Sequence, residues 1–315
     1  MQIEDRVIDS QERIGFLLRS LYAGCGYSRY RMGKFEEYDL YSRNKDFLFS
    51  ESVITFTDTN GRLMALKPDV TLSIVKNTRD TAGTLQKLYY HENVYRVASA
   101  EDGFREMTQV GVECMGEVDS TCVAEVLKLA AESLRLCSEE YVLEISHLGM
   151  LGAFVDAIAS DGKMRDELLQ CVTEKNQHGI SRICREYGRD ESAGEALRQL
   201  TGLYGSPKTV MPKIRALAEE NGASEFAEEL GRAAAAFAGS DAESRIRIDF
   251  SASGDVKYYN GIAFKGFISG IPDSVLSGGQ YDRLMRRMGR RDRAVGFAVF
   301  LNKLERLSEG GMTDA

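Results

Sequence analysis

Two long segments joined by a short polar loop, at residues 85–116, place the strongest constraint on the fold of this 315-residue chain. They read LQKLYYHENVYRVASAEDGFREMTQVGVECMG, and the loop lies at residues 98–103. Residues that alternate along a strand face opposite sides of a sheet. In the second segment, one alternate set ends in Val110, Val112 and Cys114, which suits a protein core. The pattern predicts a β-hairpin that buries one of its faces.

The other face of the second predicted strand carries Gln109, Gly111 and Glu113. A glycine between an amide and a carboxylate leaves open space above the sheet, with polar groups on both sides. This arrangement predicts the floor of a small-molecule site. A solvated strand face with a glycine at a bulge explains this strand alone equally well.

Helices and further strands are predicted on both sides of this hairpin. Asn60-Gly61 between two apolar runs is a strong hairpin signal, because Asn-Gly tolerates positive φ. Pro68 and Asp69 mark the start of a helix. Gly278-Gly279 lacks the spacing of a phosphate-binding loop, so a tight turn beside the site is expected there. Residue periodicity predicts helices at 8–24 and 120–137, and strands at 141–146, 246–251 and 258–267.

The character of the sequence changes between residues 150 and 238. Strand signals vanish there, and amphipathic helices rich in Ala, Glu, Arg and Leu replace them. Strands on both sides of a helical insertion argue for an α+β fold around a mostly antiparallel sheet. The expected divisions are a first core part at 1–149, a helical insertion at 150–240 and a second core part at 241–315.

Composition narrows the class of protein. The net charge of −8 and the pI of about 5.2 give no global basic field for nucleic acid. The six cysteines have no C-x-x-C spacing and the three histidines are scattered, so we expect reduced thiols and no metal site. The N-terminus has no apolar signal region, and no apolar run reaches the roughly 18 residues of a membrane span. A cytoplasmic protein is expected.

Five motifs, in order along the chain, resemble the catalytic core of histidyl-tRNA synthetase, a class II synthetase. They are KPDVT before a helix, YYHENVYR…FREMTQVGVE, VKYYNGIAF, SGGQYDRLM and AVGFAVFLNKLERL. The segments FEEYDLY, FTDTNGRLMALKPDVTLSIVKNT and YYNGIAFKGF resemble in particular the family of synthetase-like regulatory subunits of ATP phosphoribosyltransferase. The resemblance covers nearly the whole chain. It implies a class II synthetase-like antiparallel sheet flanked by helices, with a helical insertion.

By this resemblance, one set of residues binds free histidine. Such a site needs a carboxylate for the ammonium group, a cation or amide for the carboxylate, and polar partners for the imidazole. Glu113 is expected to hold the ammonium, with Arg96 or Gln109 oriented toward the carboxylate. Asp69 stands where the synthetases have a glutamate, so its reach is one methylene shorter. The implied histidine-binding residues are Asp69, Thr71, Arg96, Gln109, Glu113, Tyr259 and Tyr281.

The residues that would activate histidine with ATP depart from the synthetase pattern. Gly254 and Lys303 stand in place of arginines, Phe300 in place of a glycine, and Ala98 in place of a glutamate. Synthetases meet the charge of adenylate formation with arginines and Mg²⁺. Phenylalanine fills space that the nucleotide needs, and lysine lacks the planar fork of arginine. The expectation is therefore no catalytic residues, no metal and no cofactor.

The resemblance implies a non-catalytic subunit that a short-form ATP phosphoribosyltransferase catalytic subunit requires, with L-histidine as the feedback effector. It also implies a homodimer within a hetero-octamer. Histidyl-tRNA synthetases continue into an anticodon-binding domain, whereas this chain is expected to carry none and to bind no tRNA. The alternatives are a truncated histidyl-tRNA synthetase-like activating enzyme and an RNA-binding regulator. The basic run at 283–293 is interpreted as a solvated helix face and loop.

Overall fold

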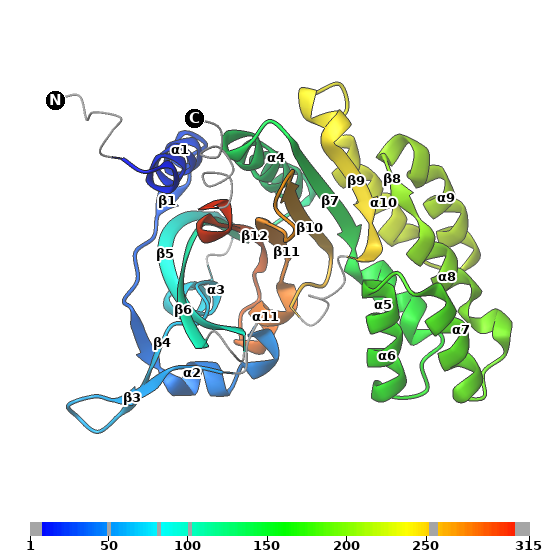
Figure 1. Cartoon of the computed structure of the whole chain (residues 1–315), viewed down its shortest axis with the longest axis horizontal. Helices are drawn as coiled ribbons and strands as arrows, with labels where there is room; N and C mark the ends of the chain where they lie inside the picture. The colour runs from blue at the N-terminus through cyan, green and yellow to red at the C-terminus, as the bar shows by residue number, and fades with distance from the viewer. Residues whose placement is uncertain (1–7, 49–51, 81–82, 100–102, 252–257, 306–315) are drawn as a thin grey trace, which may run out of the picture.

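A nine-stranded sheet forms the centre of the protein (Figure 1). Its strand order is β1-β5-β6-β12-β11-β10-β7-β9-β8, with parallel neighbours at β1–β5 and β7–β9 and antiparallel neighbours elsewhere. The computed structural model describes residues 8–48, 52–80, 83–99, 103–251 and 258–305. The strands are β1 Ser28–Arg29, β5 Leu85–Ser99, β6 Gly103–Gly116, β7 Tyr141–His147, β8 Tyr204–Gly205, β9 Ile246–Asp249, β10 Ile262–Ile268, β11 Leu276–Gln280 and β12 Arg293–Phe300.

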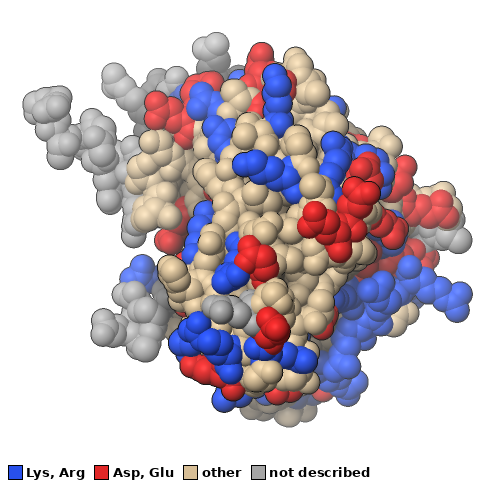
Figure 2. Space-filling view, turned by 90° about the vertical axis from the view of Figure 1, so that its right-hand side faces the viewer, with Lys and Arg blue, Asp and Glu red and all other residues tan. Residues whose placement is uncertain are grey.

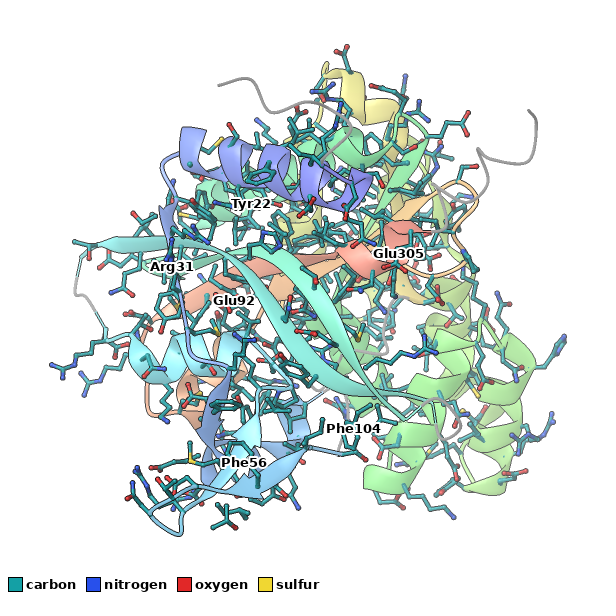
Figure 3. All side chains as sticks on the ribbon, turned by 60° about the vertical axis from the view of Figure 1, so that its left-hand side comes forward. Tyr22, Arg31, Phe56, Glu92, Phe104 and Glu305 are labelled. Atoms are coloured by element: carbon teal, nitrogen blue, oxygen red, sulfur yellow. The ribbon has the colours of Figure 1, made fainter. Side chains whose placement is uncertain are left out.

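Helices α1 (Ser10–Gly24) and α4 (Ser120–Cys137) pack on each other and on one face of the sheet (Figure 1). Asp119 caps α4 by accepting a hydrogen bond from the Cys122 N–H (2.9 Å), and the predicted apolar stripe of this helix is buried. Tyr22 of α1 points toward the sheet (Figure 3), where its ring meets Phe297 edge-on at 5.9 Å. The Tyr22 hydroxyl is hydrogen-bonded to Ser133 Oγ (2.9 Å). This face is the apolar core that the alternation of β6 predicts.

The opposite face of the sheet is covered by short elements. These are the three-stranded sheet of β2 (Phe35–Glu37), β4 (Leu63–Leu66) and β3 (Thr55–Thr57), together with α2 (Tyr38–Ser42), α3 (Thr71–Asn77), α11 (Asp282–Arg287) and the 3₁₀ turn η1 (Lys45–Phe47). The 3₁₀ turn η5 (Leu301–Leu304) instead packs against α1. The β3–β4 hairpin confirms the Asn60-Gly61 prediction, and Gly61 has the expected positive φ of 79°. Asp58 accepts hydrogen bonds from the backbone N–H groups of Asn60 and Arg62 (both 2.8 Å).

Six helices follow β7 in the chain and lie beyond that side of the sheet (Figure 1). Figure 2 faces this part of the molecule and shows acidic and basic side chains interspersed across it, rather than one basic field. Two polar contacts connect these helices to the sheet: a hydrogen bond between His147 Nε2 and Glu229 (2.9 Å) and an ion pair between Lys175 and Asp249 (2.6 Å). The helices are α5 Leu148–Asp156, α6 Gly162–Thr173, α7 Gln177–Glu186, α8 Glu195–Gly202, α9 Pro207–Glu220 and α10 Ser224–Ala235, with 3₁₀ turns η2 Glu191–Gly194 and η3 Asp241–Arg245.

Three local predictions are wrong. The two-residue strand β8 pairs with β9 inside the stretch where strand signals vanish, because its partner is supplied from a distant part of the chain. The strand expected from residue 258 begins at Ile262. Gly278-Gly279 is not a turn but lies inside β11. A Cβ on Gly278 would lie 2.6 Å from the Phe264 ring, and one on Gly279 would lie 2.9 Å from the Tyr259 ring. These glycines therefore permit close packing across the strand.

Candidate functional site

The floor of the candidate site is made of residues that lie opposite one another on neighbouring strands. Side chains that share a face repeat at every second residue, so the register of β5, β6, β12 and β11 arranges them in rows. The first row is Glu113, Gly296 and Gly279; the second is Tyr90, Gly111, Ala298 and Ser277; the third is Glu92, Gln109 and Phe300. Small residues fill the middle of the first two rows. The floor therefore has small side chains at its centre and polar side chains, such as Glu113 and Gln109, around it.

The space above Gly111 is not open, contrary to the prediction from β6 alone. A Cβ on Gly111 would lie 2.5 Å from the Tyr90 hydroxyl oxygen, so the phenol of the neighbouring strand leans across this glycine. A Cβ on Gly296 would likewise overlap the carboxylate of Glu113, whose Cδ would be 2.8 Å away. The Glu113 carboxylate thus lies over β12, at the centre of the floor. Each glycine is needed for the side chain that crosses it.

Glu113 is a buried carboxylic acid held by two hydroxyl groups. Thr71 Oγ1 donates to its Oε1 (2.7 Å), and the Tyr281 hydroxyl donates to its Oε2 (2.6 Å). Burial raises the pKa of Glu113 to about 8, and the two donated hydrogen bonds only partly oppose this shift. Within the described part of the chain, Glu113 forms no ion pair. A cation placed beside it would lower this pKa and supply the missing charge.

Asp69 and Arg96 form a second polar group of the site. Asp69 accepts a hydrogen bond from the Leu72 N–H at the start of α3 (2.8 Å), and Arg96 Nη2 lies 3.7 Å from Asp69 Oδ2. Arg96 Nε also donates to the carbonyl of Pro68 (2.7 Å). Burial raises the pKa of Asp69 and lowers that of Arg96, and the opposite charge of each limits the shift of the other. The site therefore holds a buried guanidinium near the acid of Glu113.

All the histidine-binding residues predicted from the sequence line one cavity. These are Asp69, Thr71, Arg96, Gln109, Glu113, Tyr259 and Tyr281. Further lining residues that the sequence reasoning missed are Tyr90, Tyr258, Ser277, Gly296, Phe297 and Ala298. The hairpin register places Tyr90 opposite Gly111, which is a usable signal. Ser277 was missed because its neighbours, Gly278 and Gly279, suggested a turn.

Aromatic rings narrow the cavity. The ring of Tyr258 lies 4.8 Å from that of Tyr259 and 6.1 Å from that of Tyr281, measured between centroids. The remaining volume is about 30 Å³, which is room for about two water molecules. A free amino acid is larger than this space, so side chains of the wall must turn aside when one binds.

Phe300 and Lys303, two residues that depart from the synthetase pattern, lie close together beside the cavity. Phe300 lies opposite Gln109 and lines the cavity. The Lys303 ammonium donates to the Ser274 carbonyl (2.8 Å) and lies 5.2 Å from the centroid of the Phe300 ring. Burial lowers the pKa of Lys303. Gly254 and the side chain of Ala98 lie outside the described residues.

The basic run at 283–293 is only partly a solvated face. Arg283, Arg286 and Arg287 are exposed, as predicted. Arg290 instead points inward and donates to the carbonyls of Val75 (2.9 Å) and Thr78 (3.1 Å) at the end of α3. It also pairs with Asp80 and Asp292. The run therefore includes a structural clamp, which a charge pattern alone does not reveal.

The described ranges contain neither a metal-binding cluster nor a membrane-spanning helix. Among these residues, no group of three or more His, Cys, Asp or Glu side chains is arranged to hold a metal ion. The helices found there are all too short or too polar to cross a membrane.

Comparison with known proteins gives consistent similarities. The sequence model of the family described as Histidyl-tRNA synthetase matches residues 5–304. A protein of Clostridium kluyveri named ATP phosphoribosyltransferase regulatory subunit is 29% identical over 300 residues, which cover 90% of this chain and 74% of that protein.

Solved structures agree with this match. An ATP phosphoribosyltransferase regulatory subunit/histidyl-tRNA synthetase from Bacillus halodurans superposes with a TM-score of 0.81 at 22% identity, over 94% of this chain and 79% of that one. The ATP phosphoribosyl transferase (HisG:HisZ) complex from Thermotoga maritima contains a chain with a TM-score of 0.72 at 18% identity, over 93% and 97% of the two chains. These likenesses confirm the predicted fold, an α+β class II synthetase-like sheet that is mainly antiparallel and flanked by helices.

Proposed function

The chain belongs to the histidyl-tRNA synthetase family, and from this premise we propose that it is a non-catalytic regulatory subunit of an ATP phosphoribosyltransferase. Its effector is L-histidine, the end product of the pathway that this enzyme begins. One observation carries the proposal. The residues suited to an amino acid line one cavity, which Phe300 also lines. By the resemblance, Phe300 and Lys303 stand in place of the glycine and the arginine that a synthetase uses for its nucleotide.

The chemistry of the cavity suits a zwitterionic ligand with a polar side chain. Glu113 is a buried acid without an ion-pair partner among the described residues, so a ligand ammonium is a fitting counter-charge. Arg96 and Gln109 are buried donors for a ligand carboxylate. Asp69, Thr71, Tyr259 and Tyr281 supply further polar atoms around the imidazole. Because the empty cavity is too small for histidine, binding selects an opened arrangement of the wall.

The residues beside the cavity support the proposal that this chain does not activate histidine with ATP. A donor for the phosphoryl group must be directed at the place where charge develops. Lys303 is instead committed to the Ser274 carbonyl and to the face of Phe300. The sequence adds Gly254 and Ala98, which replace charged residues of the synthetase pattern. Removing one such donor typically costs about 10²- to 10³-fold in rate, so a chain that lacks several has no useful activity.

The proposed partners follow from the named relatives. The Clostridium kluyveri protein bears the name of a regulatory subunit, and the Thermotoga maritima structure is a HisG:HisZ complex. We expect this chain to assemble in the cytoplasm with a short-form catalytic subunit, as a homodimer within a hetero-octamer. The catalytic subunit requires it for activity, and histidine bound here inhibits the complex.

The test combines assembly with activity. The chain is co-expressed with a short-form catalytic subunit, and phosphoribosyl transfer is measured with and without histidine. We expect co-purification, activity that depends on this chain, and inhibition by histidine that is lost in a Glu113→Ala complex. Full inhibition of the Glu113→Ala complex would place the inhibitory site elsewhere.

A second assay tests the alternative function, an enzyme that activates an amino acid. The match to the histidyl-tRNA synthetase family is compatible with this alternative. Histidine-dependent pyrophosphate exchange by the purified chain is expected to stay at background. Clear exchange would replace the regulatory proposal with a synthetase-like activity.

A further inference from the structure

Ser277 lies inside the cavity with an unused hydroxyl group. It stands on β11 between Lys265 of β10 and Ala298 of β12, and only 7% of its surface is exposed. Its Oγ is one of four buried side-chain polar atoms that have no hydrogen-bond partner among the described residues. The other three belong to Arg19, Tyr27 and Gln86, which do not line this cavity.

An unpaired buried hydroxyl is unfavourable for the folded protein, because it loses its hydrogen bonds to water without replacement. On β12 and along β11 the neighbours of Ser277 are Ala298 and Gly279, which carry no polar side chain. Lys265 lies opposite Ser277 on β10, but its side chain makes no hydrogen bond to the Ser277 hydroxyl. Alanine at position 277 would avoid this penalty at almost the same volume. The hydroxyl is therefore explained by a partner that enters the cavity.

Ser277 is within reach of a ligand that contacts Glu113. The Glu113 carboxylate lies over Gly296 of β12, and Ser277 stands on the next strand, one row along the floor. Neighbouring strands are about 5 Å apart, so a single amino acid spans the two groups. A serine hydroxyl both donates and accepts, which suits a carboxylate oxygen or an imidazole nitrogen.

We propose that Ser277 is a ligand-binding residue that hydrogen-bonds a second polar atom of the amino acid whose cationic nitrogen meets Glu113. This inference rests on the proposed function and adds a determinant of specificity to it. A site that holds a polar partner for a ligand atom rejects analogues that lack the atom, because the protein group is then left unpaired.

The experiment compares Ser277→Ala with a matched control, Ser133→Ala. Ser133 is also buried, but its hydroxyl is satisfied by the Leu129 carbonyl (2.6 Å) and by Tyr22 (2.9 Å), on the far side of the sheet. Calorimetry measures the affinity of each protein for L-histidine and for L-histidinol, which lacks the carboxylate. Thermal unfolding without ligand measures the stability of each variant.

We expect Ser277→Ala to bind histidine roughly threefold to tenfold more weakly, with a melting temperature equal to or above that of the wild type. Ser133→Ala should show the reverse, a lower melting temperature with unchanged affinity. If Ser277→Ala weakens the binding of histidine but not that of histidinol, the ligand carboxylate is the hydrogen-bond partner of Ser277. If the substitution weakens the binding of both ligands, the partner is a ligand nitrogen. Either pattern supports the assignment.

Three results would overturn it. Unchanged histidine affinity in Ser277→Ala, with wild-type binding intact, would remove this inference and leave the proposed function standing. A loss of ligand-free stability with unchanged affinity would show that water satisfies the hydroxyl. If the wild type binds neither histidine nor any other proteinogenic amino acid, the proposed function fails together with this inference.

Discussion

The two faces of the central sheet are both buried, but one face is apolar and the other carries polar and ionisable side chains. On β6, Val110 and Val112 pack beneath α1 and α4, whereas Gln109 and Glu113, on alternate positions, line the cavity. The apolar face stabilises the fold, because burying each apolar side chain is favourable. On the cavity face the Glu113 carboxyl group is removed from water, which makes its ionisation less favourable and raises its pKa. The apolar face therefore provides the stability on which the polar face depends.

The largest effect is expected on the apolar face. Leu127 of α4 is fully buried there, and Leu127→Ala should lower the free energy of unfolding by about 2–5 kcal/mol through lost burial and a cavity. Urea denaturation measures this change. Histidine affinity, measured by calorimetry where the variant is folded, should stay within twofold of the wild type. A large loss of affinity in the folded variant would show that the two faces are not independent.

The matching change on the cavity face is Glu113→Gln, which keeps the size of the side chain and removes its charge. Loss of a charged partner in a desolvated site costs roughly 2–5 kcal/mol, so histidine affinity should fall by well over tenfold. The free energy of unfolding at pH 7 should not fall, because the buried ionisable group is gone. The control is Glu106→Gln, an exposed position on the same strand, which should bind histidine normally. Normal binding by Glu113→Gln would place the ligand elsewhere.

The titration of Glu113 should move stability and affinity in opposite directions. Its pKa is about 8 in the folded protein against 4.5 for a solvent-exposed glutamate, so between these pH values the folded state binds more protons than the unfolded state. Stability therefore falls as pH rises through this window, by up to about 1.4 kcal/mol per pH unit. Histidine affinity rises over the same window, because the ligand ammonium needs the ionised acid.

Denaturation and calorimetry across pH 5–8 test this pair of trends, with Glu113→Gln as the reference. Glu144, whose pKa burial raises to about 7, contributes to stability with the same sign. Only the difference between the wild type and Glu113→Gln is therefore assigned to Glu113. Parallel curves for the two proteins would contradict the assignment.

The smallest effects come from two buried tyrosines, one on each face. Tyr22→Phe removes the hydrogen bond to Ser133 and should cost about 1 kcal/mol of unfolding free energy, with unchanged affinity. Tyr281→Phe removes the hydrogen bond to Glu113, which raises the pKa of Glu113 further and should weaken histidine binding by roughly tenfold. If both variants changed affinity equally, the contrast between the faces would fail.

Much of the fold was predictable because its signals are local. The helix at Ser120–Cys137 and the Leu85–Gly116 hairpin follow from residue periodicity and from polar residues at their ends. The order of the five motifs indicated the family resemblance, and the binding residues implied by that resemblance, including Glu113 and Arg96, line one cavity. The prediction of a turn at positions 278–279 is wrong because glycine has no side chain, so a pair of glycines carries no alternation that would distinguish a strand from a turn.

The amino-acid sequence by itself determined which residues of β6 share a face, and hence that an amide and a carboxylate point to the same side of the sheet. Only the tertiary structure decided what lies over that face. Gly279, Gly296 and Ser277 matter because β11 and β12 pair beside β6, and Tyr90 leans across Gly111 from β5. The register of β12 with β6 joins residues more than a hundred positions apart, and burial then sets the pKa of Glu113. Neither the pairing nor the loss of water is encoded in a local pattern, because both depend on the whole chain being folded.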